Sequence, residues 1–280
     1  MRVHLLGTRG STPVSGPEFL RYGGHTSCVA VAHDESRPRL VLDAGTGIRR
    51  LSSLLGGAAF RGTVLLSHLH WDHLQGLPFC SAAEREDSRV ALLFPEQDGD
   101  ERAVDVLARG MSPPHFPVRP DELLGTRTYA ELEPGYCQLE GFGITAAEIP
   151  HKGGRTFGYR VEYGGSTLAY LPDHCPTLLG PGRDGLGELH PAALALADGA
   201  DVLIHDAHLR ADELAEQAAY GHAAAEYAVE LGRRSGAAHV ILFHHAPDRT
   251  DEQLDQLAAR VAHETTPQVS VAAESMVVSL

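Results

Sequence analysis

The chain has 280 residues, of which 43% are hydrophobic and 21% charged, the balance of a globular protein with a sizeable core. Its 37 Asp and Glu against 23 Lys and Arg give a formal net charge of -14, which argues against general nucleic-acid binding. Four scattered cysteines without C-x-x-C spacing argue against a disulfide framework. No stretch resembles a signal peptide or reaches the ~18 apolar residues of a membrane span, so we expect a cytoplasmic protein.

The first predicted elements are strands joined by a glycine-rich loop. Residues 2–6 and Cys28–Ala32 predict two strands, and Leu40–Leu42 predicts a third. Two interpretations of the loop remain open: its amide groups and Arg9 cradle an anion, or it is a plain connection between hairpin strands. Asp43 follows the third strand just before a predicted helix, and this position alone indicates a helix cap.

The most informative stretch is Ser67–His73, which follows an apolar run and holds three histidines and an aspartate. His68 and His70 alternate as on an extended chain, so both can face one point. Asp72 and His73 lie where a helix begins and can face a second point. Imidazole and carboxylate groups are ligands of zinc, manganese and iron. Chance grouping is the alternative in a chain with 17 histidines, but the complete H-x-H-x-D-H pattern favours a metal site with room for two ions.

The middle of the chain predicts further elements and one stiff loop. Residues 74–83 and 99–110 predict helices, and residues 89–94 predict a strand. Residues 111–117 contain three prolines and predict a turn that cannot be helical. Its His115 could contact a substrate, but an exposed surface histidine is the preferred interpretation.

Several later strands end in polar residues. His151 follows a strand in the β-rich segment 126–171, before two glycines. The other candidates at strand ends or helix starts are Asp173, Asp206, His222 and His244. Because adjacent residues at a strand end face opposite ways, His174 and His245 should point away from the site. The sequence leaves open whether His25, His115, His174 or His245 contacts a substrate.

Two motifs carry a resemblance to a known family. The H-x-H-x-D-H pattern of residues 68–73 resembles the signature of the metallo-β-lactamase fold superfamily of metal-dependent hydrolases. The spacing from His151 to Gly158-Tyr159-Arg160 resembles the phosphodiesterase branch, which includes the tRNA 3′-end processing endonuclease and certain cyclic-nucleotide phosphodiesterases. The resemblance covers nearly the whole chain. It implies a single α/β domain, residues 1–280, built as an αββα sandwich: two mixed β-sheets face to face with helices outside.

The resemblance also assigns roles to the candidate residues. It implies two divalent metal ions, with zinc favoured over manganese or iron, and a dinuclear centre in which Asp173 bridges the ions. One ion would take His68, His70 and His151, and the other would take Asp72, His73 and His244. Asp43 would lie beneath the centre and orient a ligand.

The reaction implied is hydrolysis of a phosphodiester. The two ions would hold a shared hydroxide as nucleophile, Asp72 would receive the proton of the water, and His222, held by Asp206, would protonate the departing oxygen. Only 21 residues separate His151 from Asp173, which leaves no room there for the tRNA-gripping arm of the tRNA-processing enzymes. We therefore expect a small-molecule partner, a cyclic nucleotide or similar phosphodiester.

Three alternatives stay open. The same hydroxide could hydrolyse a lactone, thioester or other acyl substrate, although that reaction would not require Asp206 and His222. A tRNA 3′-processing nuclease and a metal-binding protein without catalysis rank behind both. Analogy with relatives also suggests a homodimer.

Overall fold

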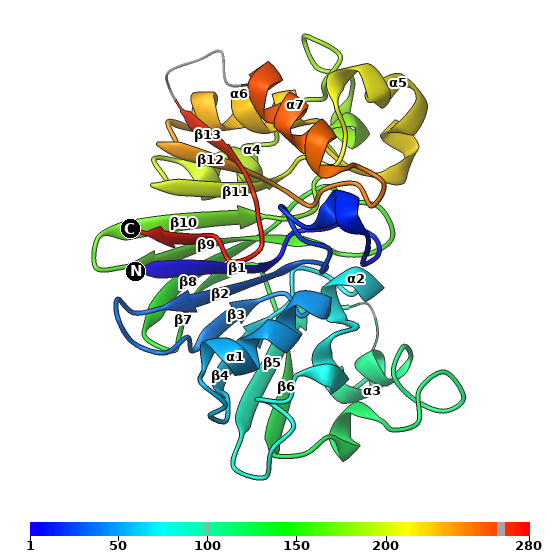
Figure 1. Ribbon diagram of the computed structural model, residues 1–280, viewed down its shortest axis with the longest axis vertical. Helices are drawn as coiled ribbons and strands as arrows, with labels where there is room; N and C mark the ends of the chain where they lie inside the picture. Colours follow the sequence, from blue (N-terminus) through cyan, green and yellow to red (C-terminus); the bar gives the residue numbers. More distant parts are fainter. Residues whose placement is uncertain (98, 100, 262–266) are drawn as a thin grey trace.

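The computed structural model describes residues 1–97, 99, 101–261 and 267–280. Within these residues the strands form two sheets of seven strands each (Figure 1). In spatial order, the first sheet contains β14 (Val277–Ser279), β1 (Arg2–Gly7), β2 (Cys28–Ala32), β3 (Leu40–Leu42), β4 (Arg61–Leu65), β5 (Arg89–Pro95) and β6 (Thr126–Leu132). The second contains β13 (Gln268–Val271), β12 (His239–Phe243), β11 (Val202–Asp206), β10 (Ser166–Leu171), β9 (Phe157–Tyr163), β8 (Phe142–Glu148) and β7 (Gly135–Leu139).

Both sheets are mixed. Strands β3 to β6 are parallel, and so are β10 to β13, whereas the remaining pairs are antiparallel. The sheets pack face to face through one cluster of buried side chains, to which Leu5 and Leu42 contribute from the first sheet and Tyr170, Ile204 and Phe243 from the second. Burying a side chain of this size contributes about 1.5–3 kcal/mol, so this shared layer holds the two sheets together.

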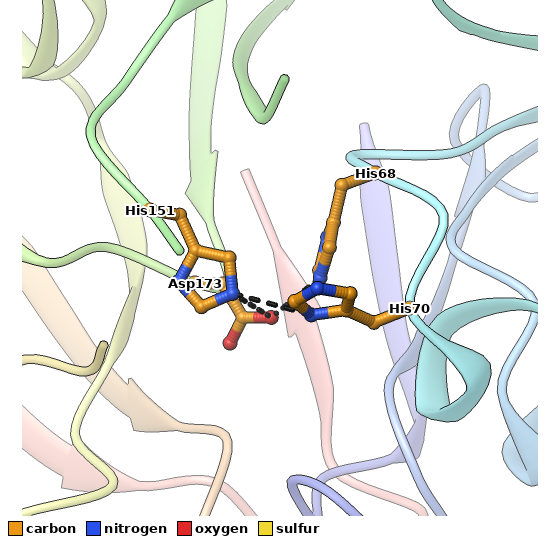
Figure 2. Close-up of side chains that lie close together, drawn as sticks. All are labelled: His68, His70, His151 and Asp173. Carbon is orange, nitrogen blue, oxygen red and sulfur yellow. Dashed lines mark hydrogen bonds and ion pairs between the residues drawn. The ribbon is translucent and has the colours of Figure 1, made fainter. Parts of the chain in front are cut away.

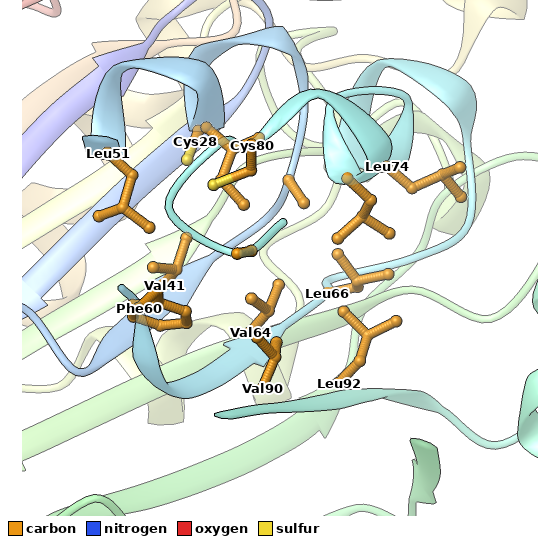
Figure 3. Close-up of a cluster of buried hydrophobic side chains, with 14 of the residues drawn as sticks. Cys28, Val41, Leu51, Phe60, Val64, Leu66, Leu74, Cys80, Val90 and Leu92 are labelled. Carbon is orange, nitrogen blue, oxygen red and sulfur yellow. The ribbon is translucent and has the colours of Figure 1, made fainter. Parts of the chain in front are cut away.

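Helices cover the two outer faces (Figure 1). On the first sheet lie η2 (Thr46–Arg50), α1 (Leu51–Leu54), α2 (Trp71–Leu74), η3 (Leu77–Phe79), α3 (Ala103–Ala108) and η4 (Pro120–Glu122). Figure 3 shows the apolar cluster beneath them, with Val41, Val64 and Leu92 of the sheet facing Leu51 and Leu74. On the second sheet lie α4 (Pro191–Ala197), α6 (Ala225–Ser235) and α7 (Asp251–Val261). The short elements η1 (Pro17–Phe19), η5 (Pro176–Leu179), η6 (Ala211–Glu213), α5 (Leu214–Gln217) and η7 (Ala218–Tyr220) belong to connections. The predicted αββα architecture is confirmed.

Two predicted helices are shorter than expected. Instead of one helix over 74–83, the chain forms α2, then the 3₁₀ turn η3, then an irregular turn. Pro78 explains the break, because it lacks the amide proton that a continuing helix would need. Of the helix predicted over 99–110, residue 100 lies outside the described residues, and the described part forms a helix only in α3, after an extended Arg102.

The parallel strands bring the candidate residues to one rim. The stretch Ser67–His73 follows β4, and Asp43 follows β3 in the first sheet. From the second sheet, Asp173 follows β10 and His244 follows β12. Because the carboxyl ends of parallel strands lie at the same edge, both sheets present their polar groups at one end of the sandwich.

Two further expectations concern the whole chain. The cysteines Cys28, Cys80, Cys137 and Cys175 are free, as predicted. Each helix in the described part of the chain is too short or too polar to cross a bilayer.

Candidate active site

The seven predicted metal ligands converge in two overlapping groups. One contains His68, His70, His151 and Asp173, and the other contains Asp72, His73, Asp173 and His244. Within each group the donor atoms lie within 4.8 Å of one another. Figure 2 shows His68 and His70 reaching toward His151 and Asp173 from the opposite side. The grouping is the one expected from the sequence, with Asp173 common to both sets.

Asp173 occupies the centre. Its Oδ2 lies 3.0 Å from His68 Nε2 and 2.9 Å from His73 Nε2, and its Oδ1 lies 3.0 Å from His244 Nε2. Yet His68 Nε2 and Asp173 Oδ1 are buried and make no hydrogen bond to the described residues. Buried polar atoms left in this way normally cost free energy. A buried imidazole nitrogen and a buried carboxylate oxygen that lack hydrogen bonds, among seven converging ligand side chains, fit the coordination of a shared cation, so this set fits a pair of divalent metals.

The rear nitrogens of three of the rings, those of His68, His73 and His151, are held by oxygen acceptors. His73 Nδ1 donates to Asp43 Oδ2 at 2.8 Å, and His151 Nδ1 donates to the carbonyl of Gly221 at 2.7 Å. Ser67 Oγ donates to Asp43 Oδ2 at 2.9 Å, so it can accept from His68 Nδ1 at 3.0 Å. These bonds place the ring proton on Nδ1 and leave Nε2 as the lone-pair donor that a metal requires.

Asp43 therefore orients ligands and caps no helix. The N-cap of the following 3₁₀ helix is Gly45, without a side-chain hydrogen bond. Both oxygens of Asp43 are used: Oδ1 accepts from the amide of Ser67 at 2.6 Å, and Oδ2 also accepts from the hydroxyl of Tyr170 at 2.7 Å. Its φ of +59° is strained for a non-glycine residue and directs this fully buried carboxylate beneath the cluster.

Burial and neighbouring charge divide the rings into two kinds. Burial lowers the pKa of both His68 and His151 to about 4, so these rings are neutral near pH 7 and available as ligands. Burial also lowers the pKa of His73, but Asp72, Asp43 and Asp173 outweigh it and hold that pKa well above its usual value. Without a bound cation, the three carboxylates therefore favour the protonated, positively charged form of His73.

A second cluster adjoins the metal ligands. His222 Nδ1 lies 3.1 Å from Asp206 Oδ2 and 3.4 Å from Asp173 Oδ1. Burial raises the pKa of Asp206, but the charge of His222 and its hydrogen bond outweigh this and lower it to about 2. Asp206 also accepts the amides of His174 and Ala223, which fixes it in place. The structure thus brings together the predicted Asp206 and His222 pair beside the bridging carboxylate.

His222 also has the geometry of a further donor. It groups with Asp173, Asp206 and His244, and separately with His208 and His244. His208 was not assigned from the sequence. Its ring stacks on that of His222, with centroids 4.2 Å apart and planes 16° from parallel, and its Nδ1 lies 3.1 Å from the carbonyl of His244. The feature of the sequence that could have identified His208 is its position two residues after Asp206, at the same strand end.

The neighbouring histidines lie as expected. His174 points away, with Nδ1 3.0 Å from His205 Nε2, and His245 Nε2 donates to the carbonyl of Ala272 at 2.8 Å. His115 is exposed. His25 pairs with Glu274 at 3.0 Å.

The glycine-rich loop donates a hydrogen bond to Asp72, a carboxylate of the protein itself. Arg9 is fully buried, and its guanidinium donates to the carbonyls of Gly23, Ala246 and Arg249, so the interpretation in which Arg9 binds an external anion is wrong. Instead, the amide of Ser11 donates to Asp72 Oδ2 at 2.7 Å. The loop thus holds a candidate metal ligand in position.

Gly10 gives the first testable expectation. A Cβ at this position would lie 2.4 Å from His244 Nδ1 and 2.5 Å from its Cε1, closer than atoms can approach. The ring of His244 has little freedom to retreat, because its Nε2 lies 3.0 Å from both Asp72 Oδ2 and Asp173 Oδ1 and the ring stacks on that of His73. We expect Gly10→Ala to weaken metal binding about 10–100-fold, the usual effect of disturbing a ligand's support. Metal titration measures this, with Gly110→Ala as control, because a Cβ there would make only ordinary contacts at 3.8 and 3.9 Å.

An open cavity of about 980 Å³ leads to the cluster. Its lining contains Asp72, His151 and His222, so the candidate ligands and the acid pair face the same space. Two exposed aromatic residues, Trp71 and Tyr220, also line it, with 73% and 67% of their surfaces accessible. The acidic residues Glu216 and Asp248 complete the mouth.

Comparisons with known proteins agree with this geometry. A family profile described as a beta-lactamase superfamily domain matches residues 38–245. Ribonuclease Z of Haloarcula marismortui is 27% identical over 284 residues, covering 87% of this chain and 86% of that protein. Among solved structures, the metallo-beta-lactamase fold protein YhfI from Bacillus subtilis has a TM-score of 0.71 at 17% identity and covers 99% of both chains. The short form of human tRNase Z has a TM-score of 0.66 at 21% identity, covering 100% of this chain and 99% of that one. The chain belongs to the beta-lactamase superfamily of hydrolases and has the metallo-β-lactamase fold, and its ribonuclease Z relative agrees with the phosphodiesterase branch indicated by its sequence motifs.

Proposed function

We propose that the protein is a metal-dependent phosphodiesterase acting on a small phosphodiester, such as a cyclic nucleotide. The observation that carries this proposal is the buried pair of Asp206 and His222 beside the bridging Asp173. Hydrolysis of a phosphodiester of an alcohol breaks a phosphorus–oxygen bond, and the departing alkoxide needs a proton from a positioned acid. An acyl substrate makes less demand on such a pair, because its hydrolysis begins with addition of water to the carbonyl and a thioester then expels a thiolate that departs without a proton.

Asp72, His222 and Asp206 each have a role in this reaction. A pair of divalent cations, when bound, supplies a water of lowered pKa and neutralises charge on the phosphoryl oxygens. Asp72, which lines the cavity, accepts the proton of the attacking water. His222 transfers its proton to the departing ester oxygen as the phosphorus–oxygen bond breaks. Asp206 orients the ring of His222 for that transfer.

The cavity favours a small substrate that contains a ring. Among the described residues that line it, none is Lys or Arg, whereas Asp72, Glu216 and Asp248 are acidic. Such a lining disfavours a long polyanion, whose successive phosphates need cationic contacts. Exposed Trp71 and Tyr220 provide faces on which a nucleobase can stack.

Trp71 provides a test of the substrate class. Because stacking on an aromatic side chain contributes about 1–3 kcal/mol per base, we expect Trp71→Ala to raise the KM for a cyclic nucleotide about 5–100-fold with kcat nearly unchanged. Trp71→Phe should retain most of the affinity. Steady-state kinetics on a cyclic nucleotide and on a ring-free glycerophosphodiester would measure the effect, and an equal change in KM for both would contradict base stacking.

A substrate panel tests the reaction itself. The zinc- and manganese-loaded protein should hydrolyse bis-p-nitrophenyl phosphate and at least one cyclic nucleotide faster than lactone or thioester substrates. Faster turnover of the acyl substrates would overturn the proposal. A precursor tRNA belongs in the panel because of the ribonuclease Z relative. Preferential cleavage of its 3′ trailer would replace the small phosphodiester by tRNA.

A further inference from the structure

A second cavity lies at the other end of the first sheet. Its volume is about 940 Å³, within the range of about 300–1,000 Å³ typical of small-ligand sites. It is lined by residues at the amino ends of β4 and β5 and by the connection before β3. The candidate active site follows the carboxyl ends of β3 and β4, which run parallel, so the two cavities lie at opposite edges of the sheet.

Four arginines line this cavity. Arg37 and Arg39 precede β3, Arg61 begins β4, and Arg89 begins β5. Among the described lining residues the one acidic side chain is Glu140. In a chain of formal charge -14, this is a local excess of positive charge that contrasts with the acidic lining of the active-site cavity.

Most of this positive charge is not neutralised within the protein. Glu140 Oε2 lies 2.9 Å from Arg39 Nε, while Glu140 Oε1 accepts from Thr63, so this carboxylate serves one arginine. Arg61 uses Nε to bond the carbonyl of Asp87 at 3.1 Å. Within the described residues, the guanidinium groups of Arg37 and Arg89 have no hydrogen-bond or ion-pair partner. Guanidinium forks match phosphate oxygens in geometry and charge.

The rest of the lining combines apolar residues with the small polar residues Ser36, Thr126 and Thr128. Leu55 and Val90 belong to the sheet-and-helix layer that forms the first core. The ring of His33 packs against Phe142 and Tyr163, with ring centroids 4.1 and 4.3 Å apart. The cavity therefore offers apolar side chains and one imidazole ring, held from behind by Phe142 and Tyr163, beside its arginines; we call the apolar side chains of Leu55 and Val90 the apolar floor.

We propose that this cavity binds a small organic polyphosphate, a nucleoside diphosphate or triphosphate, with the phosphates on Arg37, Arg61 and Arg89 and the ring on the apolar floor. Arginines on three chain segments suit more than one phosphate group, and the apolar floor with the ring of His33 suits an organic ring rather than an inorganic anion. The concave shape and the negative charge of the whole chain disfavour a nucleic-acid backbone. This site stands independently of the phosphodiesterase proposal.

Calorimetric titration of the full chain with ADP, ATP and inorganic pyrophosphate tests the site. We expect the double variant Arg37→Ala/Arg89→Ala to weaken ATP binding at least about tenfold, since each charge-assisted hydrogen bond contributes about that factor. The double variant Arg102→Ala/Arg183→Ala removes the same charge from exposed positions elsewhere and should bind as the wild type does. Thermal unfolding of each variant checks that folding is retained.

Two comparisons separate this site from the active site. His68→Ala should leave ATP binding within about twofold, because it alters the opposite edge of the sheet. Loss of binding in His68→Ala together with full binding in Arg37→Ala/Arg89→Ala would place the nucleotide at the metal cluster and overturn the proposal. Equal weakening by both arginine pairs, or no binding to the wild type at millimolar nucleotide, would overturn it as well. Pyrophosphate binding as tight as ATP binding would refute the role of the apolar floor.

Discussion

Asp173→Ala should abolish the dinuclear centre. Asp173 is the one carboxylate shared by both donor groups, and its two oxygens lie within 3.0 Å of His68, His73 and His244. Loss of a residue that merely supports a ligand costs about 10–100-fold in metal affinity or activity, so loss of the shared ligand should lower phosphodiesterase activity by more than about 100-fold. Metal content should fall below two ions per chain.

Elemental analysis of the purified variant and assay of bis-p-nitrophenyl phosphate hydrolysis measure the two effects. Asp184→Ala is the matched control, because Asp184 is exposed and lies outside both donor groups. An Asp173→Ala protein that keeps two ions and activity within twofold of wild type would remove the basis of the proposed centre. A circular dichroism spectrum like that of the wild type would show that any loss is local.

His222→Ala should lower kcat according to the leaving group. A positioned general acid contributes about 10²–10⁴-fold, and this contribution is needed when an alkoxide departs from a cyclic nucleotide. The p-nitrophenolate ion departs without a proton, so bis-p-nitrophenyl phosphate should lose far less activity. Asp206→Asn should show the same contrast with a smaller loss, because Asp206 orients His222.

The contrast between substrates separates proton transfer from other roles. His222 also lies within reach of Asp173 and His244 as a metal donor, so metal content must be measured in the same variant. Equal losses on both substrates, accompanied by lost metal, would make His222 a ligand and refute its role as the acid. His115→Ala, which removes an exposed histidine, should match the wild type on both substrates.

The sequence predicted the site better than the helices around it. The ligands in residues 68–73 follow one strand, so local spacing was enough to group them. Asp173 and His244 were assigned as ligands through the family resemblance, and the fold explains why they join the others, because parallel strands bring their carboxyl ends to one edge. Helix length was harder to predict, since one proline at residue 78 outweighed a favourable apolar pattern.

Other features depend on contacts between distant segments. Arg9 looks like an anion ligand in the sequence, but it is buried by carbonyls of the segment near Ala246, more than 200 residues away. The position of Asp43 alone indicates a helix cap, and only the family resemblance predicted that it orients a ligand, as its contacts with Ser67, His73 and Tyr170 show. Local patterns reveal neither set of contacts, because the partners lie far away in the sequence.

The two layers of the sandwich each supply part of the candidate metal centre. His68, His70, Asp72 and His73 follow β4 of the first sheet, whereas His151, Asp173 and His244 follow strands of the second. Cations bound there would link the two sheets, because each sheet supplies some of the ligands. Ligand present at about 100 times its dissociation constant adds about 2.7 kcal/mol to the native state, so chelation should lower the melting temperature and speed amide exchange first at this rim. The ions that take part in catalysis would then also stabilise the packing of the two sheets at this rim.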